Sequence, residues 1–174
     1  MWGAPLTVSV ALPDAGEVRV DSAVLTTMWA FAQCGRHDTE AGGVLIGHYP
    51  ATSMDVVLDR LTTPLPGDQR TRTRFYRSQA PHQAEIDREW AVSGGRRVYL
   101  GEWHTHPERV PHPSHIDFNG WRDKLFAKLP YPRLLFVIVG TERTRMWHGC
   151  CGSPFTRLVL DIATEVPHAQ SQQR

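Results

Sequence analysis

The run Leu134–Val139, LLFVIV, narrows the possible folds most, because all of its side chains are apolar. A strand that is apolar on both faces fits the interior of a sheet covered on both sides. The run is far shorter than the roughly 18 apolar residues that a membrane-spanning helix needs. It therefore predicts a buried strand, with other elements packed against both faces of the sheet.

Strands and helices alternate irregularly along the rest of the chain. Alternating or continuous apolar residues predict further strands, and apolar residues at helical spacing predict three helices. The predicted strands span 6–12, 44–49, 54–58, 97–106, 146–151 and 155–162, of which 44–49 and 54–58 form a hairpin, and the predicted helices span 20–33, 81–92 and 114–129. This order indicates one α/β (α+β) domain over residues 1–164, built on a mixed sheet, followed by a polar, disordered tail at 165–174.

The overall composition excludes several classes of function. The 174-residue chain has a formal net charge of +1, which gives no bulk attraction to nucleic acid or to an anionic membrane. Cys34, Cys150 and Cys151 are odd in number and form no C-x-x-C pair, so we expect no disulfides and a reducing, cytoplasmic location. We expect these cysteines to be small buried apolar residues, and the alternative of a cysteine peptidase rests on them alone.

The segment GEWHTHPERVPHPSHID, residues 101–117, concentrates the candidate metal ligands. His104 and His106 are two positions apart on a predicted strand, so both imidazoles point to the same face. Trp103 points the other way, toward the expected core. Ser114 and Asp117 share one face at the start of the next predicted helix, where they could instead form only a capping box.

Two imidazoles and one carboxylate are the ligand set of a catalytic zinc, which keeps a fourth position open. His112 and His115 are near enough in sequence to compete as ligands, and the position of His115 beside Ser114 ranks it lower. Glu40, ahead of the glycine pair Gly42–Gly43, is a candidate general base. Glu102, which shares a face with His104, is a candidate for supporting the ligands or contacting substrate.

Together these residues resemble a known family. The pattern E-x-G-G-x-L-x-G at 40–47, followed by H-x-H-x7-S-x-x-D at 104–117, is similar to that of the JAMM (JAB1/MPN/Mov34) metallopeptidases. The resemblance spans residues 40–141, and GEWHTHP is most similar to bacterial JAB-domain proteins, some of which accompany ubiquitin-like E1 and E2 enzymes in CBASS and related anti-phage operons.

The resemblance implies a curved mixed sheet flanked by helices, of the JAMM and cytidine-deaminase-like type. It implies one zinc ion per chain, held by His104, His106 and Asp117. It also implies Glu40 as general base and acid, and Ser114 as the hydroxyl that stabilises the oxyanion. The implied reaction is hydrolysis of the peptide or isopeptide bond after the C-terminal glycine of a ubiquitin-like protein.

The arginine-rich run Arg70–Ser78 is the candidate for substrate contact. Alternating arginines predict one basic face that includes Arg72 and Arg74, with Phe75 and Tyr76 as apolar contacts. A solvated surface run is the alternative, and nucleic-acid binding is not expected. Two other functions remain open from sequence: processing of a β-grasp sulfur-carrier protein, and a non-catalytic MPN scaffold.

Overall fold

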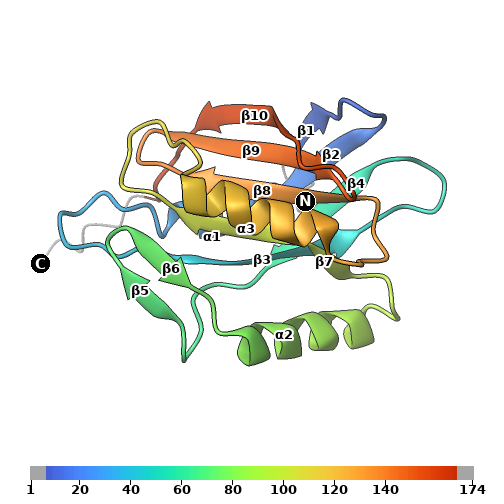
Figure 1. The fold of residues 1–174 in the computed structure, drawn as a ribbon, viewed down its shortest axis with the longest axis horizontal. Helices are drawn as coiled ribbons and strands as arrows, with labels where there is room; N and C mark the ends of the chain where they lie inside the picture. Colours follow the sequence, from blue (N-terminus) through green and yellow to red (C-terminus); the bar gives the residue numbers. More distant parts are fainter. Residues whose placement is uncertain (1–6, 168–174) are drawn as a thin grey trace, which may run out of the picture.

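Strand β8 (Arg133–Val139) lies inside the sheet, as its apolar run predicts, and every one of its residues is buried. Its neighbours are β7 (Val98–Thr105), which runs parallel to it, and β9 (Arg143–Cys150), which runs antiparallel. The computed structural model describes residues 7–167, so most of the predicted tail lies outside the described residues (Figure 1). The predicted mixed sheet is confirmed.

The sheet has eight strands in the order β1-β2-β4-β3-β7-β8-β9-β10. The predicted hairpin is confirmed, since β3 and β4 pair antiparallel. A separate two-stranded hairpin, β5–β6, stands beside the sheet (Figure 1). The remaining elements are β1 (Thr7–Ala11), β2 (Glu17–Asp21), α1 (Ser22–Trp29), β3 (Gly42–His48), β4 (Val56–Leu61), β5 (Gln69–Thr71), β6 (Arg74–Tyr76), α2 (Gln79–Val92), α3 (His115–Phe126) and β10 (Thr156–Ala163).

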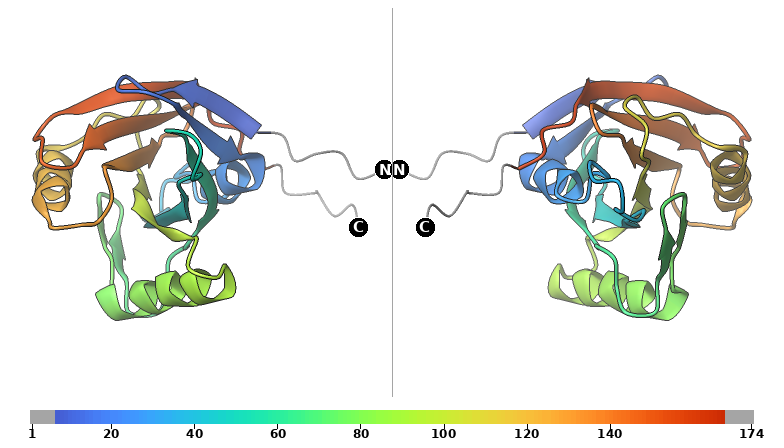
Figure 2. Two further views of the ribbon diagram at one scale, coloured as in Figure 1. Left: turned by 90° about the vertical axis from the view of Figure 1, so that its right-hand side faces the viewer. Right: turned by 90° about the vertical axis from the view of Figure 1, so that its left-hand side faces the viewer.

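The sheet is strongly curved, and its two outer strands β1 and β10 come into contact (Figure 2). Register shifts interrupt the pairing of β3 with both of its neighbours, next to Ile46. Such bulges bend a strand and increase its twist. The central strand β3 therefore bends the sheet where it pairs with β4 and β7, and the predicted curved sheet flanked by helices is confirmed.

Alternate residues of β8 face two different cores. Leu135, Val137 and Val139 pack with α1 in the larger cluster. Leu134, Phe136 and Ile138 pack with α3 in the smaller cluster, where the rings of Trp121 and Phe136 stack with centroids 4.7 Å apart. The two helices therefore hold opposite faces of the same strand, as an all-apolar strand requires.

Helix α2 and the loop before it are fixed by a buried polar network. His82 is fully buried, and its two ring nitrogens lie 2.6 Å from Thr62 Oγ1 and 3.0 Å from Asp68 Oδ2. Asp68 also accepts hydrogen bonds from the backbone N–H groups of Leu65 and Ser78. Because the bond to Ser78 lies just after β6, the network anchors the base of the β5–β6 hairpin.

Two helices end earlier than their sequence patterns predict. Helix α1 ends at Trp29 instead of at residue 33, because the chain after it tightens into turns in which Phe31 and Ala32 bond the third residue back. Helix α3 ends at Phe126 instead of at residue 129, because Ala127 is extended and the carbonyl of Leu125 accepts from the N–H of Gly152. Local turns thus replace the last helical turn of α1, and a tertiary hydrogen bond accompanies the early end of α3.

We expect Asp68→Asn to lower the free energy of unfolding by about 2–3 kcal/mol at neutral pH, because it weakens three buried hydrogen bonds to a charged acceptor. Burial opposes ionisation of Asp68, but its hydrogen-bond donors outweigh burial and lower its pKa. The difference in the free energy of unfolding between wild type and Asp68→Asn is therefore largest above about pH 4. It vanishes as the pH falls through the lowered pKa that Asp68 has in the folded protein.

Urea denaturation between pH 3 and pH 7 measures this difference. Asp87→Asn is the matched control, because Asp87 is an exposed carboxylate on α2 and should change stability by less than about 0.5 kcal/mol. Equal effects of the two substitutions would contradict a structural role for Asp68.

Candidate metal centre and catalytic cavity

The end of β7 brings the two candidate imidazoles together. His104 and His106 leave the sheet on the same face, and their Nε2 atoms lie 3.0 Å apart. Trp103 points to the opposite face and is buried in the cluster under α1, as predicted. Backbone pairing of His104 with Gly42 of β3 and Ile138 of β8 fixes the strand on both sides.

The start of α3 brings Asp117 to the same point. Its Oδ1 lies 3.2 Å from His104 Nε2, and its Oδ2 lies 3.5 Å from His106 Nε2. The same carboxylate accepts from the backbone N–H of Ser114, while the Ser114 hydroxyl accepts from the N–H of Asp117. The capping box expected as an alternative is therefore present, and it coexists with the approach of Asp117 to the histidines.

The donor set and its spacing fit a divalent metal ion. Zinc bonds of 2.0–2.2 Å in a tetrahedral site separate the ligand atoms by roughly 3.3–3.6 Å. The three distances here, 3.0, 3.2 and 3.5 Å, lie close to that range. Among the described residues, no fourth histidine, cysteine or carboxylate belongs to the group, so His112 and His115 stay outside it.

The electrostatics of the group favour binding of a cation. Burial opposes ionisation of Asp117, but hydrogen bonds from His104 and His106 outweigh it and hold the pKa of Asp117 well below its ordinary value. Burial likewise opposes protonation of His106, but the bond to Asp117 prevails and raises the pKa of His106. Binding of a metal would displace the proton that the raised pKa of His106 favours.

Glu40 lies in the wall of the same cavity, which has a volume of about 470 Å³. Its side chain is only 5% exposed. Burial raises the pKa of Glu40 to about 7, the nearby charges of Asp117 and Glu108 add to the rise, and His106 opposes it. A carboxyl group with such a pKa can both accept and donate a proton near neutral pH.

Two glycines after Glu40 allow close packing around this wall. A Cβ atom on Gly42 would lie 2.7 Å from the ring of Phe75, and one on Gly43 would lie 2.1 Å from the carbonyl oxygen of Thr62. Side chains at either position would push the hairpin or the preceding loop away from β3. The absence of side chains at Gly42 and Gly43 therefore permits this close approach.

The cavity also contains the hydroxyl of Ser114 and most of the predicted substrate-contact residues. Arg74, Phe75 and Tyr76 line it, and the guanidinium of Arg74 lies 5.3 Å from the Tyr76 ring centroid. Arg72 does not line the cavity, because its guanidinium donates to the carbonyl oxygens of Gly35 and Arg36. The arginines of the hairpin thus point in different directions and do not form the single basic face that their alternation predicts.

Glu102 lies between two cations in this cavity, 2.8 Å from Arg77 and 3.2 Å from Lys124. Lys124 was not predicted as a site residue, although its position seven residues after Asp117 puts it on the same face of α3. Arg77 belongs to the run Arg70–Ser78 predicted to contact substrate, but its pairing with Glu102 could not be predicted, because the two are 25 residues apart.

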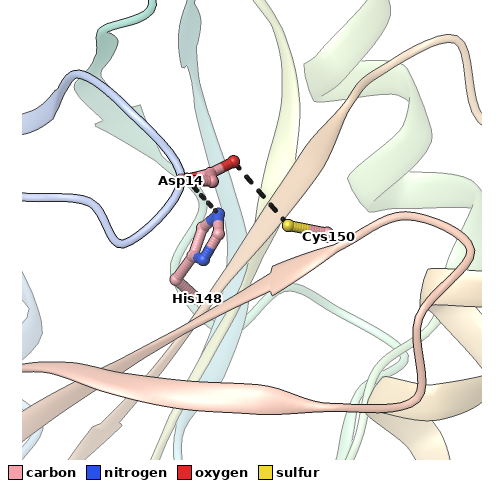
Figure 3. A group of neighbouring side chains, drawn as sticks. All are labelled: Asp14, His148 and Cys150. Atoms are coloured by element: carbon pink, nitrogen blue, oxygen red, sulfur yellow. Dashed lines mark hydrogen bonds and ion pairs between the residues drawn. The ribbon is translucent and has the colours of Figure 1, made fainter.

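A second group of metal-binding residue types lies at the C-terminal end of β9, where Asp14 faces both His148 and Cys150 (Figure 3). His148 Nε2 lies 3.6 Å from Asp14 Oδ1, and Cys150 Sγ donates to Asp14 Oδ2 over 3.7 Å. The guanidinium of Arg133, which is 2% exposed, lies 3.1 Å from the same carboxylate. A buried cation already neutralises Asp14 and would repel a metal ion, so we interpret this group as an ion-paired cluster.

Cys150 and Cys151 show no sign of a nucleophile. Burial raises the pKa values of Cys150 and Cys151, which keeps both thiols protonated, whereas a reactive cysteine needs a lowered pKa. The three cysteines are unpaired, as predicted. The prediction that all are buried is wrong: Cys34 is exposed in the loop after α1, and Cys150 and Cys151 are only half-buried.

Comparison with known proteins agrees with this geometry. The family described as prokaryotic homologs of the JAB domain matches residues 21–149. A protein of Escherichia coli (strain TW11681) named CD-NTase/cGAS isopeptidase is 36% identical over 132 residues, which are 76% of this chain and 80% of that protein. One of the same name from Pseudomonas aeruginosa (strain BWHPSA011 / Pa011) is 40% identical over 117 residues, covering 67% of this chain and 72% of that one.

Two further proteins extend the comparison. The probable metalloprotease y4qB of Sinorhizobium fredii (strain NBRC 101917 / NGR234) is 33% identical over 113 residues, which are 61% of this chain and 66% of that protein. The solution structure of protein DSY2949 from Desulfitobacterium hafniense shares the fold, with a TM-score of 0.53 at 20% identity over 85% of this chain and 90% of that one. The match over most of the domain shows that the chain belongs to the prokaryotic JAB-domain family.

Proposed function

We propose that the protein is a zinc-dependent isopeptidase that cleaves after the C-terminal glycine of a ubiquitin-like modifier. One observation carries the proposal: His104, His106 and Asp117 converge at 3.0–3.5 Å in a cavity that also contains Glu40 and Ser114. Three donors with no fourth protein ligand in the described group suit a catalytic metal better than a structural one.

The names of the relatives suggest the substrate. Proteins called CD-NTase/cGAS isopeptidase imply conjugates in which the modifier is joined to a nucleotidyltransferase of this class. We place this chain in the same role, reversing such conjugates in a bacterial anti-phage pathway that includes E1- and E2-like enzymes. This choice favours deconjugation over maturation of a modifier and over processing of a sulfur carrier. Three unpaired cysteines agree with a cytoplasmic setting.

The proposed mechanism assigns one role to each group. His104, His106 and Asp117 would hold the zinc ion, which would supply Lewis acidity and make water more acidic. Glu40 takes the proton from the attacking water and delivers it to the departing amine, for which its pKa of about 7 is well placed. The Ser114 hydroxyl, which accepts from the N–H of Asp117, keeps its own hydrogen for the developing oxyanion.

The β5–β6 hairpin offers a place for the modifier tail. Strand β6 pairs with β5 along one edge, and within residues 7–167 no strand pairs with its other edge. An extended tail can add to such an edge through backbone hydrogen bonds. Arg74, Phe75 and Tyr76 then contact the tail from the side of the cavity that they line.

Removing a proposed ligand should remove the metal. We expect His104→Ala, His106→Ala and Asp117→Ala each to weaken zinc binding at least about tenfold, because each eliminates one of three protein ligands. His112→Ala is the matched control, because His112 belongs to the same segment but lies outside the group. Calorimetric titration with zinc measures the change, and equal affinity of His106→Ala and His112→Ala would contradict the assignment.

Removing the proposed base should spare the metal and abolish the chemistry. We expect Glu40→Gln to bind zinc like wild type and to lower kcat about 100-fold or more, the usual contribution of a general base. The assay incubates a nucleotidyltransferase–modifier conjugate with each protein, with and without chelator, and locates the cut by mass spectrometry. Cleavage by Glu40→Gln at the wild-type rate would rule out this base, and chelator-resistant cleavage would rule out the metal.

Reversing a charge on the hairpin should distinguish recognition from chemistry. We expect Arg74→Glu to lower kcat/KM about tenfold more for the whole conjugate than for a short peptide, because Arg74 lines the cavity beyond the metal group, whereas its effect on the pKa of Glu40 is common to both substrates. Arg157→Glu, on the exposed side of β10, is the control for the change in net charge. Equal losses on conjugate and peptide would argue against recognition by Arg74.

A further inference from the structure

Gln33 occupies an unusual position just beyond α1. Its side chain is 2% exposed, and its amide nitrogen donates to the carbonyl oxygens of Asp38, over 3.2 Å, and Arg72, over 2.8 Å. Its amide oxygen accepts from the Thr105 hydroxyl over 3.0 Å. This orientation is fixed, because two carbonyl oxygens can only accept hydrogen bonds and must face the NH2 group.

Thr105 continues the connection into the catalytic centre. It lies between His104 and His106 on β7, with its side chain fully buried on the opposite face. While its hydroxyl donates to Gln33, the same oxygen accepts from the N–H of Ala41, the residue after Glu40, over 3.0 Å. Gln33 and Thr105 therefore join three segments that are far apart in sequence: the hairpin turn, the histidine strand and the segment that contains the proposed base.

The hairpin also contacts the base segment directly. The N–H of Glu40 donates to the carbonyl oxygen of Thr71 over 2.7 Å, and Arg70 Nε donates to the carbonyl oxygen of Glu40 over 2.6 Å. Figure 1 shows the β5–β6 hairpin beside the loop that follows α1, to which Arg72 is bonded. At its other end, the hairpin is anchored through Ser78 and Asp68. It is thus held at both ends.

We propose that Gln33 is a positioning residue that couples the β5–β6 hairpin to Glu40 and to the histidine strand. Displacing the hairpin would break the bond from Gln33 to the Arg72 carbonyl and leave one amide hydrogen of the buried Gln33 without its partner, which is costly. The hairpin and the segment that orients Glu40 are therefore held in one relative position, so a displacement of the hairpin also displaces the base. The catalytic part of this proposal rests on the proposed function, whereas the mechanical link does not.

The link is tested with Gln33→Leu, which keeps the approximate size of the side chain and removes its hydrogen bonds. Hydrogen–deuterium exchange should rise at least about fivefold in residues 69–76 and 40–41 and stay unchanged in β9, and zinc content should match wild type. On the conjugate, kcat/KM should fall about tenfold or more, with an increase in KM as well as a loss in kcat. Gln83→Leu, an exposed glutamine on α2, is the matched control.

Thr105 supplies a conservative pair for the same link. Thr105→Val removes the hydroxyl and should reproduce the exchange and kinetic changes of Gln33→Leu, whereas Thr105→Ser keeps the hydroxyl and should restore exchange to within about twofold of wild type. Wild-type exchange in Gln33→Leu, or a kcat loss that only follows the folded fraction with KM unchanged, would overturn the proposal. If wild type cleaves no conjugate but Gln33→Leu still increases exchange at 69–76, the proposed function fails and the link stands.

Discussion

The pairing of β7 between β3 and β8 is the constraint on which the candidate site depends. It fixes the backbone on both sides of His104, so that two imidazoles two residues apart meet with their Nε2 atoms 3.0 Å apart. Burial of Trp103 in the cluster under α1 holds that register, because a slip of one residue would turn Trp103 out of this core and bring Glu102 or His104 into it. The packing that stabilises the sheet therefore also fixes the geometry of the site.

Asp117 shows how a structural interaction can also prepare chemistry. Its carboxylate caps the first turn of α3 through the N–H of Ser114, and the same bond aims it at His104 and His106. A carboxylate at a helix N-terminus is favoured by the helix dipole, so its negative charge is stabilised before any metal binds. The capping and ligand roles are compatible because a carboxylate has two oxygens and several lone pairs.

The sequence was sufficient to predict the elements that local patterns control. The i, i+2 histidines, the capping box and the apolar strand each depend on neighbours close in sequence, and the structure contains all three. The end of α1 could not be predicted, because Gln33 leaves the helical course to bond partners 39 and 72 residues away. The direction of Arg72 was missed for the same reason, since its acceptors lie in a loop more than thirty residues earlier.

The two groups of metal-binding residue types show why residue identity alone does not define a metal site. In both groups a carboxylate faces two other donors at short range. Asp117 meets two imidazoles and a backbone N–H, so its charge remains available to a cation. Asp14 meets the buried guanidinium of Arg133 at 3.1 Å, and burial together with the charge of Arg133 lowers the pKa of His148 even though Asp14 opposes this. The neighbouring charge thus decides which group can hold a metal, and that neighbour becomes visible only when distant strands are brought together.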